Sequence, residues 1–515
     1  MKRLLLSALI LGIALLPGCG RGPEASDAQG RENPAPPDPV SEYARTITAE
    51  RLKEHIAYLA SDELEGRHSG TRGGVKAAEY LSSRFRDLGL KGDPFQDGSY
   101  RQKFRMVRRT PVDCFLESET GRADNWEDFM ELYSDFSGEK EVELVWAGTG
   151  RDLDLEGKDF EGKLVAFFQG TPDREVVSND FERVKIEKIL QQKAAGTLLV
   201  VRDDPPFLDY VRRLKPYFFK EHHALSRSPG EALASKRRIS ISTAGAMKLL
   251  GRRPTEVTAA GDDANHAAER LSGLAVRLRM VSAYEEADSI FGENVLAYLE
   301  GTAEGRECLV LTAHYDHLGK SGAEIFNGAY DNAAGVASLL EIAEAFASAA
   351  RDGHRPPRSI VFLAPDAEEL GGLGSRFYLE SPVFPLSDTL ADINLDGIGR
   401  EDVERPDLED FVHLYLSRNG RADLRRIKTG ALERLATRLR IEPRDSYAGS
   451  DHAVFEERLI PAVALTTGQP KDRHQPTDTA DKIDYQSVRD IARLAFAMAW
   501  EIAFGERPIK RIISE

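Results

Sequence analysis

The chain has 515 residues and a formal net charge of −16, with 41% hydrophobic and 30% charged residues. This length exceeds what one simple core fills, so we expect two or three domains in an ordinary soluble globular protein. The acidic balance argues against a surface for nucleic acid or for anionic membranes, because both require a basic face.

The first residues resemble a processing signal. Lys2 and Arg3 precede the apolar run Leu4–Leu16, which is too short to span a membrane comfortably, and the run ends in LPGC at Cys19. This ending resembles a bacterial lipobox, in which cleavage leaves the cysteine to carry a lipid. We therefore expect residues 1–19 to be a signal peptide. The protein would be an exported lipoprotein of the cell envelope, or else periplasmic or secreted, with an uncleaved anchor as the remaining alternative.

Composition divides the rest of the chain into parts. Gly20–Arg45 is rich in proline, glycine and acidic residues and has almost no apolar content, which predicts a disordered tether. Two amphipathic helices are expected between Thr48 and Gly89. We expect one domain in two parts, separated by an insert and followed by a short tail: 46–110 and 276–507 for the domain, 111–275 for the insert and 508–515 for the tail.

The insert differs from its surroundings in its sequence pattern. Short apolar runs bounded by glycine, such as EVELVWAG (Glu141–Gly148) and GKLVAFFQG (Gly162–Gly170), predict strands. None of these strands carries a cluster of histidines or carboxylates. The insert is therefore expected to be a β-rich domain without chemistry of its own.

After Glu293, apolar runs alternate with helical patterns. Strands are expected within Glu307–Gly319, Ser359–Glu369 and Asp392–Gly399, and a helix over Asn332–Ala350. Another helix is expected at the end of the chain. This alternation predicts an α/β fold with a mostly parallel central sheet flanked by helices.

Imidazoles and carboxylates gather around the ends of these apolar runs, where α/β folds place their sites. The candidate ligands are His314, Asp331, Glu369, Asp396 and His474. Five nitrogen and oxygen donors suit a pair of zinc ions. Glu368, directly before Glu369, adds a carboxylate that could act on water instead of holding metal.

Each candidate also has a simpler interpretation. Asp331 could be the N-cap of the helix that follows it, a position that aspartate favours. The HYDH string with His314 could be a satisfied loop cluster, and the glutamate pair could be solvated charge. Asp396 could be a turn residue and His474 an exposed loop histidine.

The geometry of a strand predicts the directions of two neighbours of His314. Residues two apart on a strand face the same side, so Asp316 could fix the His314 imidazole from behind. His317 would point away from His314 and is expected to have no part in the site.

Six motifs, in this order, resemble the di-zinc aminopeptidase family, peptidase family M28: HYDHLG, GAYDNAAG, DAEELGGLGS, NLDGIG, SDHAVF and RHQPTDT. The resemblance covers about Thr46–Val107 and Phe291–Phe504. The insert between them is similar to a protease-associated (PA) domain, which is a common insertion in this family.

The resemblance implies a zinc-exopeptidase-like fold with two zinc ions per chain. His314 and Asp396 would complement one ion, Glu369 and His474 the other, and Asp331 would bridge the pair.

Three further residues have roles that the resemblance implies. Glu368 would be the general base, Asp316 would orient His314, and Tyr447 would donate to the developing oxyanion. Tyr330 and Ala334 depart from residues that are frequent in the family, but neither is expected to touch metal.

The implied function is that of an exported zinc exopeptidase acting on peptides, most simply an aminopeptidase. Alternatives at the same metals are carboxypeptidase, dipeptidase or glutaminyl cyclase chemistry, and a non-catalytic receptor-like binding protein on the same scaffold. A site that reads a carboxylate needs an arginine, and the candidates are Arg67, Arg72, Arg376 and Arg473. No nucleic-acid partner is expected, and membrane contact only through a lipid on Cys19.

Overall fold

The computed structural model describes residues 38–131, 136–170, 179–202, 204–218, 220–234, 236–252, 271, 275–303, 305–435, 437–445, 447, 449–507 and 509–510. The expected signal peptide with Cys19 lies outside these residues. The expected tether extends to Arg45, but its last residues form helix α1 (Pro39–Ala44) with Val40 and Tyr43 buried. Tyr43 stacks on Trp500 with ring centroids 6.1 Å apart, so this part of the segment belongs to the folded domain.

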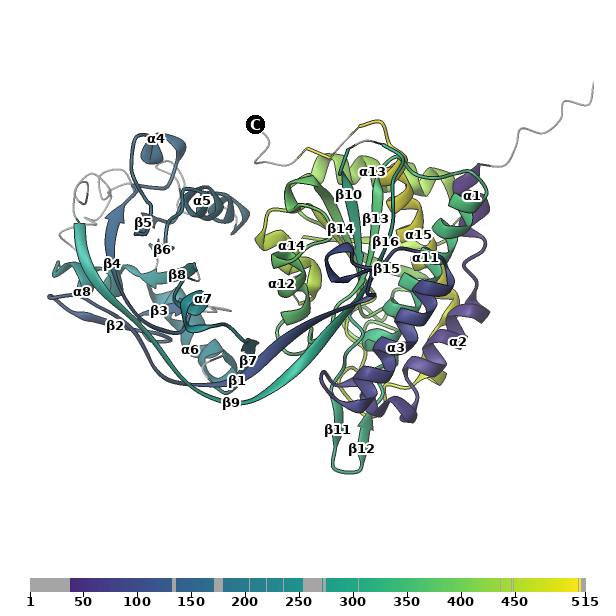
Figure 1. The fold of residues 1–515 in the computed structure, drawn as a ribbon, viewed down its shortest axis with the longest axis horizontal. Coiled ribbons are helices and arrows are strands. Elements are labelled where there is room, and N and C mark those ends of the chain that lie inside the picture. Colours follow the sequence, from purple (N-terminus) through teal and green to yellow (C-terminus); the bar gives the residue numbers. More distant parts are fainter. Residues whose placement is uncertain are drawn as a thin grey trace, which may run out of the picture. The chain divides into compact units, whose positions relative to one another are not determined.

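A mixed sheet with a parallel centre forms the core of the main domain (Figure 1). The central strands β17, β14, β10 and β13 are parallel, and β15 and β9 add antiparallel neighbours on either side. The order is β16 (Arg440–Arg444), β15 (Phe411–Leu416), β17 (Ala462–Thr466), β14 (Thr389–Leu395), β10 (Cys308–Thr312), β13 (Ser359–Ala364) and β9 (Ala275–Leu299). This architecture confirms the predicted α/β fold with a mostly parallel sheet flanked by helices.

Both faces of this sheet are covered, which explains the continuous apolar strands. On β10, Leu309 and Leu311 join the larger core, whereas Val310 packs on the opposite face with Phe455. Helices on the first face are α2 (Ala49–Leu59), α3 (Arg72–Asp87), α11 (Ala334–Arg351), α13 (Arg421–Arg434) and α15 (Tyr485–Phe504); α12 (Leu373–Glu380) and α14 (Asp451–Glu457) cover the other.

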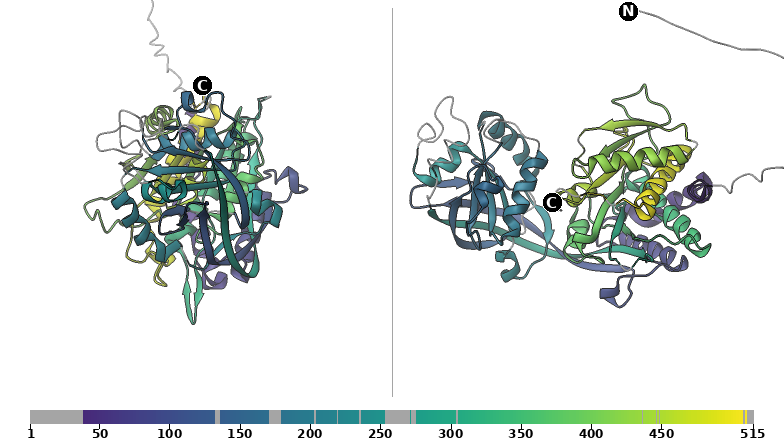
Figure 2. Two further views of the ribbon diagram at one scale, coloured as in Figure 1. Left: turned by 90° about the vertical axis from the view of Figure 1, so that its left-hand side faces the viewer. Right: turned by 90° about the horizontal axis from the view of Figure 1, so that it is seen from above.

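Helices α11 and α15, both on the first face, pack on each other; α15 is the yellow helix in the right-hand view of Figure 2. Phe346 of α11 contacts Phe496 of α15 with ring centroids 4.7 Å apart. Within the described part of the chain, Ala329–Arg351 is long and apolar enough to cross a membrane, but 83% of its most apolar window is buried inside the protein.

Two long antiparallel strands lead into the insert. β1 (Arg101–Glu117) pairs with β9 along most of its length, so the expected boundary between Thr110 and Pro111 falls inside a continuous strand. The expected boundary therefore lies along a two-stranded ladder and not at a loop.

The insert contains helices as well as strands, so it is less purely β than expected. Its centre is a parallel group, β4, β5, β6 and β8, flanked by β9 and β3. Its elements are β2 (Arg122–Asp124), β3 (Phe129–Glu131), β4 (Gly138–Trp146), α4 (Asp152–Leu155), β5 (Leu164–Phe168), α5 (Asn179–Gln191), β6 (Gly196–Val201), α6 (Asp204–Phe218), β7 (His222–Leu225), α7 (Pro229–Ala234), β8 (Arg237–Ser242) and α8 (Thr243–Leu250). The likeness to a PA domain stays a prediction.

The strands that lead to the candidate site end earlier than the apolar pattern suggested. β10 ends at Thr312 and β13 at Ala364, so His314 and Glu368 lie in the loops that follow. Ala367, directly before Glu368, is buried and has a φ of 58°, in the left-handed region that a strand does not use. The chain therefore turns before it presents the glutamate pair.

Candidate metal centre

The candidate ligands meet at one edge of the sheet because they follow parallel strands. His314 follows β10, Glu369 follows β13 and Asp396 follows β14, and the carboxyl ends of such strands share an edge. Asp331 comes from a single π-helical turn, Ala329–Ala333, directly before α11. His474 comes from the loop after β17, where its φ of 57° is also left-handed.

One group of donors surrounds the His314 imidazole. Its Nε2 lies 3.3 Å from Asp331 Oδ1 and 3.3 Å from Asp396 Oδ1. All three side chains are buried, and their donor atoms lie within 4.8 Å of one another. These are the residues of the first predicted ligand set together with the predicted bridge.

The second group forms around Glu369. His474 Nε2 lies 3.0 Å from Asp331 Oδ2 and 3.4 Å from Glu369 Oε2. His317 Nδ1 lies 2.7 Å from Glu369 Oε1, and its ring meets that of His474 edge-on at 5.7 Å. The second predicted set is thus also brought together, and it gains a histidine that was not predicted.

The position of His317 corrects the expectation that it would point away from the site. That expectation assumed an extended strand through the HYDH motif, whereas residues 313–318 have no regular secondary structure. Once the chain leaves the strand at Thr312, alternation no longer sets the direction of its side chains. A second imidazole three residues after His314 was the available signal.

Asp331 divides its two oxygens between the groups. Oδ1 faces His314 and Oδ2 faces His474, and neither caps the helix. Asn332 has the capping role instead, because its Oδ1 accepts a hydrogen bond from Gly335 N at 3.1 Å. The helix begins at Ala334, two residues later than expected. Asp331 is therefore free to bridge.

Asp316 supports both halves of the centre from behind. Its backbone carbonyl lies 3.2 Å from His314 Nδ1, and its Oδ1 lies 3.6 Å from the same nitrogen. Its carboxylate also accepts hydrogen bonds from the backbone N–H groups of Glu368 and Glu369, at 3.0 and 3.3 Å. Asp316 thus fixes the turn that carries the glutamates as well as the face of the imidazole.

Two buried charged residues hold the backbone around Asp331. Asp478 accepts hydrogen bonds from the N–H groups of Tyr330 and Asp331 at 2.9 and 3.2 Å. Arg67, only 1% exposed, donates to the carbonyls of Tyr315 and Gly328 at 2.8 and 3.0 Å. The guanidinium of Arg67 thus donates its hydrogen bonds to backbone carbonyls and not to the candidate ligands.

The electrostatics of the centre favour ionised carboxylates on the ligands. Burial opposes ionisation of Asp331, but hydrogen bonds from His314 and His474 hold its pKa well below the ordinary value. Burial and the charge of Asp331 also oppose ionisation of Glu369, yet hydrogen bonds from His317 and His474 lower its pKa to about 2. Hydrogen bonds to Asp331 and Glu369 raise the pKa of His474 to about 10.

The pKa of Glu368 is shifted in the opposite direction, upward. Its carboxylate lies 4.0 Å from His314 Nε2 and its side chain is 18% exposed. Burial, followed by the charges of Glu369 and Asp396, raises the pKa of this carboxyl well above its usual value despite the opposing effect of His314. Glu368 is therefore a group that holds a proton readily beside the ligands.

Tyr447 lies close enough to the centre for the charge of Asp396 to affect the pKa of its hydroxyl. Burial, then the charge of Asp396, raises the pKa of its hydroxyl well above the usual value, so the hydroxyl keeps its proton. Its ring stacks on His452 with centroids 4.9 Å apart. The phenol can therefore serve as a hydrogen-bond donor.

The chemistry of this donor set fits two divalent cations. Asp331, Glu368, Glu369 and Asp396 converge, and among the described residues Arg473 is the arginine that pairs with them. Buried carboxylates require compensating charge, and metal ions supply it. His317 Nε2 is also a buried nitrogen without a hydrogen-bond partner in the described structure.

Comparison with known protein families tests the resemblance that the motifs predict. Residues 294–499 match the model of peptidase family M28. This part of the chain belongs to that family. The matched M28 region begins within β9 and ends within α15, so it contains every candidate ligand.

Curated relatives of the M28 region include proteins of different kinds. Transferrin receptor protein 2 of Mus musculus is 36% identical over 87 residues, which cover 17% of this chain and 10% of that protein. Aminopeptidase YwaD of Bacillus subtilis (strain 168) is 26% identical over 217 residues, which cover 40% of this chain and 43% of that protein. The match thus spans less than half the length of these relatives.

Solved structures align over more of the chain. An aminopeptidase from Aneurinibacillus sp. strain AM-1 aligns with 92% of this chain and 98% of that chain, at 20% identity and a TM-score of 0.47. BSAP, a zinc aminopeptidase from Bacillus subtilis, aligns with 90% of this chain and 96% of that chain, at 18% identity and a TM-score of 0.45.

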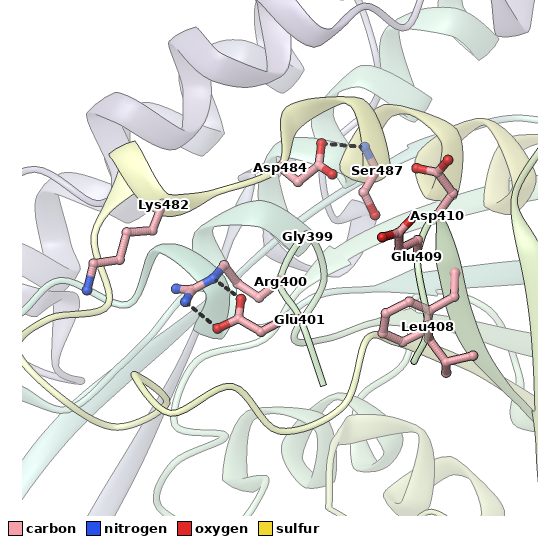
Figure 3. Close-up of a pocket in the computed structure, with 10 residues that line it drawn as sticks. Gly399, Arg400, Glu401, Leu408, Glu409, Asp410, Lys482, Asp484 and Ser487 are labelled. Carbon is pink, nitrogen blue, oxygen red and sulfur yellow. Dashed lines mark hydrogen bonds and ion pairs between the residues drawn. The ribbon is translucent and has the colours of Figure 1, made fainter. Parts of the chain in front are cut away.

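A cavity of about 420 Å³ is lined by none of the candidate metal ligands (Figure 3). Its charged groups include Glu401, Arg400 and Lys482. Arg400 pairs with Glu401 at 2.9 Å, and both Arg400 and Lys482 reach Asp472 on the loop that carries His474. The wall of this cavity thus anchors the His474 loop.

Proposed function

We propose that the protein is an exported zinc exopeptidase that removes N-terminal residues from peptides. The observation that carries this proposal is the division of the Asp331 oxygens between two donor groups. Imidazole and carboxylate ligands suit zinc, and the YwaD relative bears the name aminopeptidase. Export is supported by the signal-like sequence of residues 1–19.

The residues around the centre have complementary roles in this reaction. When bound, a pair of zinc ions supplies a water of lowered pKa and an electrophile for the peptide carbonyl. Glu368 accepts the proton of the attacking water and returns it to the leaving amine, a task that its raised proton affinity suits. Tyr447 donates a hydrogen bond to the carbonyl oxygen as negative charge develops there.

A panel of peptides tests this function. Tetrapeptides with a free N-terminus, a blocked N-terminus or an amidated C-terminus are incubated with the protein, with and without a chelator. We expect cleavage of the free and amidated peptides, no cleavage of the blocked one, loss of activity with chelator and recovery with zinc. Hydrolysis from the C-terminus would instead indicate a carboxypeptidase. Absence of both hydrolysis and stoichiometric zinc would indicate a receptor-like protein.

The insert contacts Ala367, directly before the proposed base, which supports a role in substrate selection. Leu225 on β7 of the insert packs in one buried cluster with Ala367, the residue directly before Glu368, and with Leu373 of α12. A side chain of the insert therefore lies against the turn that presents the proposed base. We infer that the insert restricts which peptides reach the centre.

Removal of the insert tests this inference. Arg109 and Glu286 are register partners on β1 and β9, so a two-residue turn can join them and close a hairpin. We expect the shortened protein to cleave ten-residue peptides better, relative to dipeptides, than the full chain does. Leu225→Ser in the full chain is the companion variant, and an unchanged length preference in both would contradict the inference.

A further inference from the structure

The arginine directly before His474 contacts the predicted bridging carboxylate. Arg473 Nε lies 3.2 Å from Asp331 Oδ2, and Nη1 donates to Gln469 Oε1 at 3.1 Å. The side chain keeps 30% of its surface exposed. For Nη2 no partner occurs among the described residues. Nε and Nη1 are thus held in place, and Nη2 is available to a ligand.

The other arginines considered for reading a carboxylate are committed elsewhere or lie outside the centre. Arg67 is buried on backbone carbonyls, and Arg376 forms a paired contact with Glu457 at 2.7 and 3.0 Å. Arg72 is exposed at the start of α3. Of the four candidates, Arg473 alone contacts a ligand residue.

The loop that carries Arg473 is rigidly supported. Asp472 pairs with Arg400 at 2.9 Å and with Lys482 at 3.0 Å, the two cationic side chains seen in Figure 3. The backbone N–H of Gln469 donates to the buried Asp402 at 3.4 Å. A preorganised guanidinium binds a carboxylate at a smaller entropic cost than a mobile one.

The remaining donor of Arg473 favours an anionic ligand at this place. Nη2 belongs to a guanidinium that is always charged, so it can donate a charge-assisted hydrogen bond to a carboxylate. Such a bond is shorter and stronger than one between neutral groups.

We propose that Arg473 binds a carboxylate of the substrate close to the scissile bond, so that the centre prefers short peptides that carry one there. The proposal rests on the peptidase activity proposed above. The carboxylate has two possible sources with the same chemistry: the C-terminal carboxylate of a dipeptide, or the side chain of an aspartate or glutamate beside the scissile bond.

Matched substrate pairs distinguish the two sources. Leu-Gly is compared with Leu-Gly amide for the C-terminal carboxylate, and Leu-Asp amide with Leu-Asn amide for the side chain. We expect the wild type to prefer the anionic member of at least one pair by tenfold or more in kcat/KM. Arg473→Gln should remove this preference mainly through KM, with the neutral members affected much less, because the lost contact is a charge-assisted hydrogen bond.

Two control variants separate substrate recognition from support of the metal centre. Arg72→Gln removes an exposed arginine and should leave the preference intact. Arg473→Lys keeps the charge but not the planar guanidinium that Asp331 and Gln469 hold in place, and it should retain part of the preference. Zinc content is measured for each variant, since Arg473 also touches Asp331.

Binding measurements make the test independent of turnover. The same peptide pairs are titrated calorimetrically into zinc-loaded Glu368→Gln protein, with and without Arg473→Gln. Equal binding of charged and neutral members, or a preference that survives Arg473→Gln, would overturn the proposal. If tetrapeptide amides are still cleaved in that case, the peptidase function stands. If no peptide of any kind is cleaved, that function fails, and the binding pairs still decide on Arg473.

Discussion

Replacement of Glu368 by glutamine is expected to abolish nearly all peptide hydrolysis while both zinc ions remain bound. Glutamine has the same shape but cannot accept a proton, and a positioned acid–base group contributes about 100- to 10,000-fold to a rate. Glu368 lies beside His314, at 4.0 Å, yet its neighbour Glu369 makes the contacts with the two histidines of the second group. The loss should therefore appear in kcat, with zinc content unchanged.

A matched control and a metal assay complete this experiment. Glu401→Gln alters a glutamate that is 56% exposed and pairs with Arg400, outside the ligand set, so its activity should stay near that of the wild type. Zinc per chain is measured in both variants by elemental analysis. Undiminished hydrolysis by Glu368→Gln would refute its role as base, and loss of zinc would show that it is a ligand instead.

The second large effect is expected for Asp331→Asn, which should release both metals. The carboxylate faces His314 with one oxygen and His474 with the other, at 3.3 and 3.0 Å, and asparagine keeps only one uncharged oxygen. A ligand bound at a thousandfold excess over its Kd stabilises a fold by about 4 kcal/mol. We therefore expect zinc to raise the melting temperature of the wild type but not of this variant.

His317→Gln provides the comparison for that result. His317 belongs to the second group through Glu369, whereas His314, Asp331 and Asp396 remain intact in this variant. It should lose no more than the zinc of the second group and keep part of the thermal shift. If Asp331→Asn retained two zinc ions and the full shift, the shared bridge would be wrong.

Three of the predicted ligands could be assigned to one edge of the sheet from sequence because each follows an apolar run. Apolar runs before His314, Glu369 and Asp396 mark strands that the protein covers on both faces, and parallel strands deliver their ends to one edge. The order of the motifs predicted a relationship to peptidase family M28, and residues 294–499 match the model of that family. Local pattern and chain order therefore sufficed for the fold class.

His317 could not be placed in this way. Its direction depends on the point where β10 ends, and the sequence continues from Thr312 into AHYDHL without a glycine or proline that would mark the end of a strand. Asp331 shows the same limit, because aspartate before a helix is more often a cap. Only the neighbouring Asn332, which takes the capping hydrogen bond, reveals that Asp331 is available for another role.

The sequence by itself determined the α/β class, and it predicted the place of the insert and the residue types that converge at one edge of the sheet. These follow from periodicity and from the chemistry of individual side chains. The tertiary structure alone decided that Asp331 divides its oxygens, that His317 joins Glu369, and that Arg473 reaches the centre while Arg67 does not. Such contacts join residues that are far apart in the chain, and their directions depend on turns whose geometry no local pattern encodes.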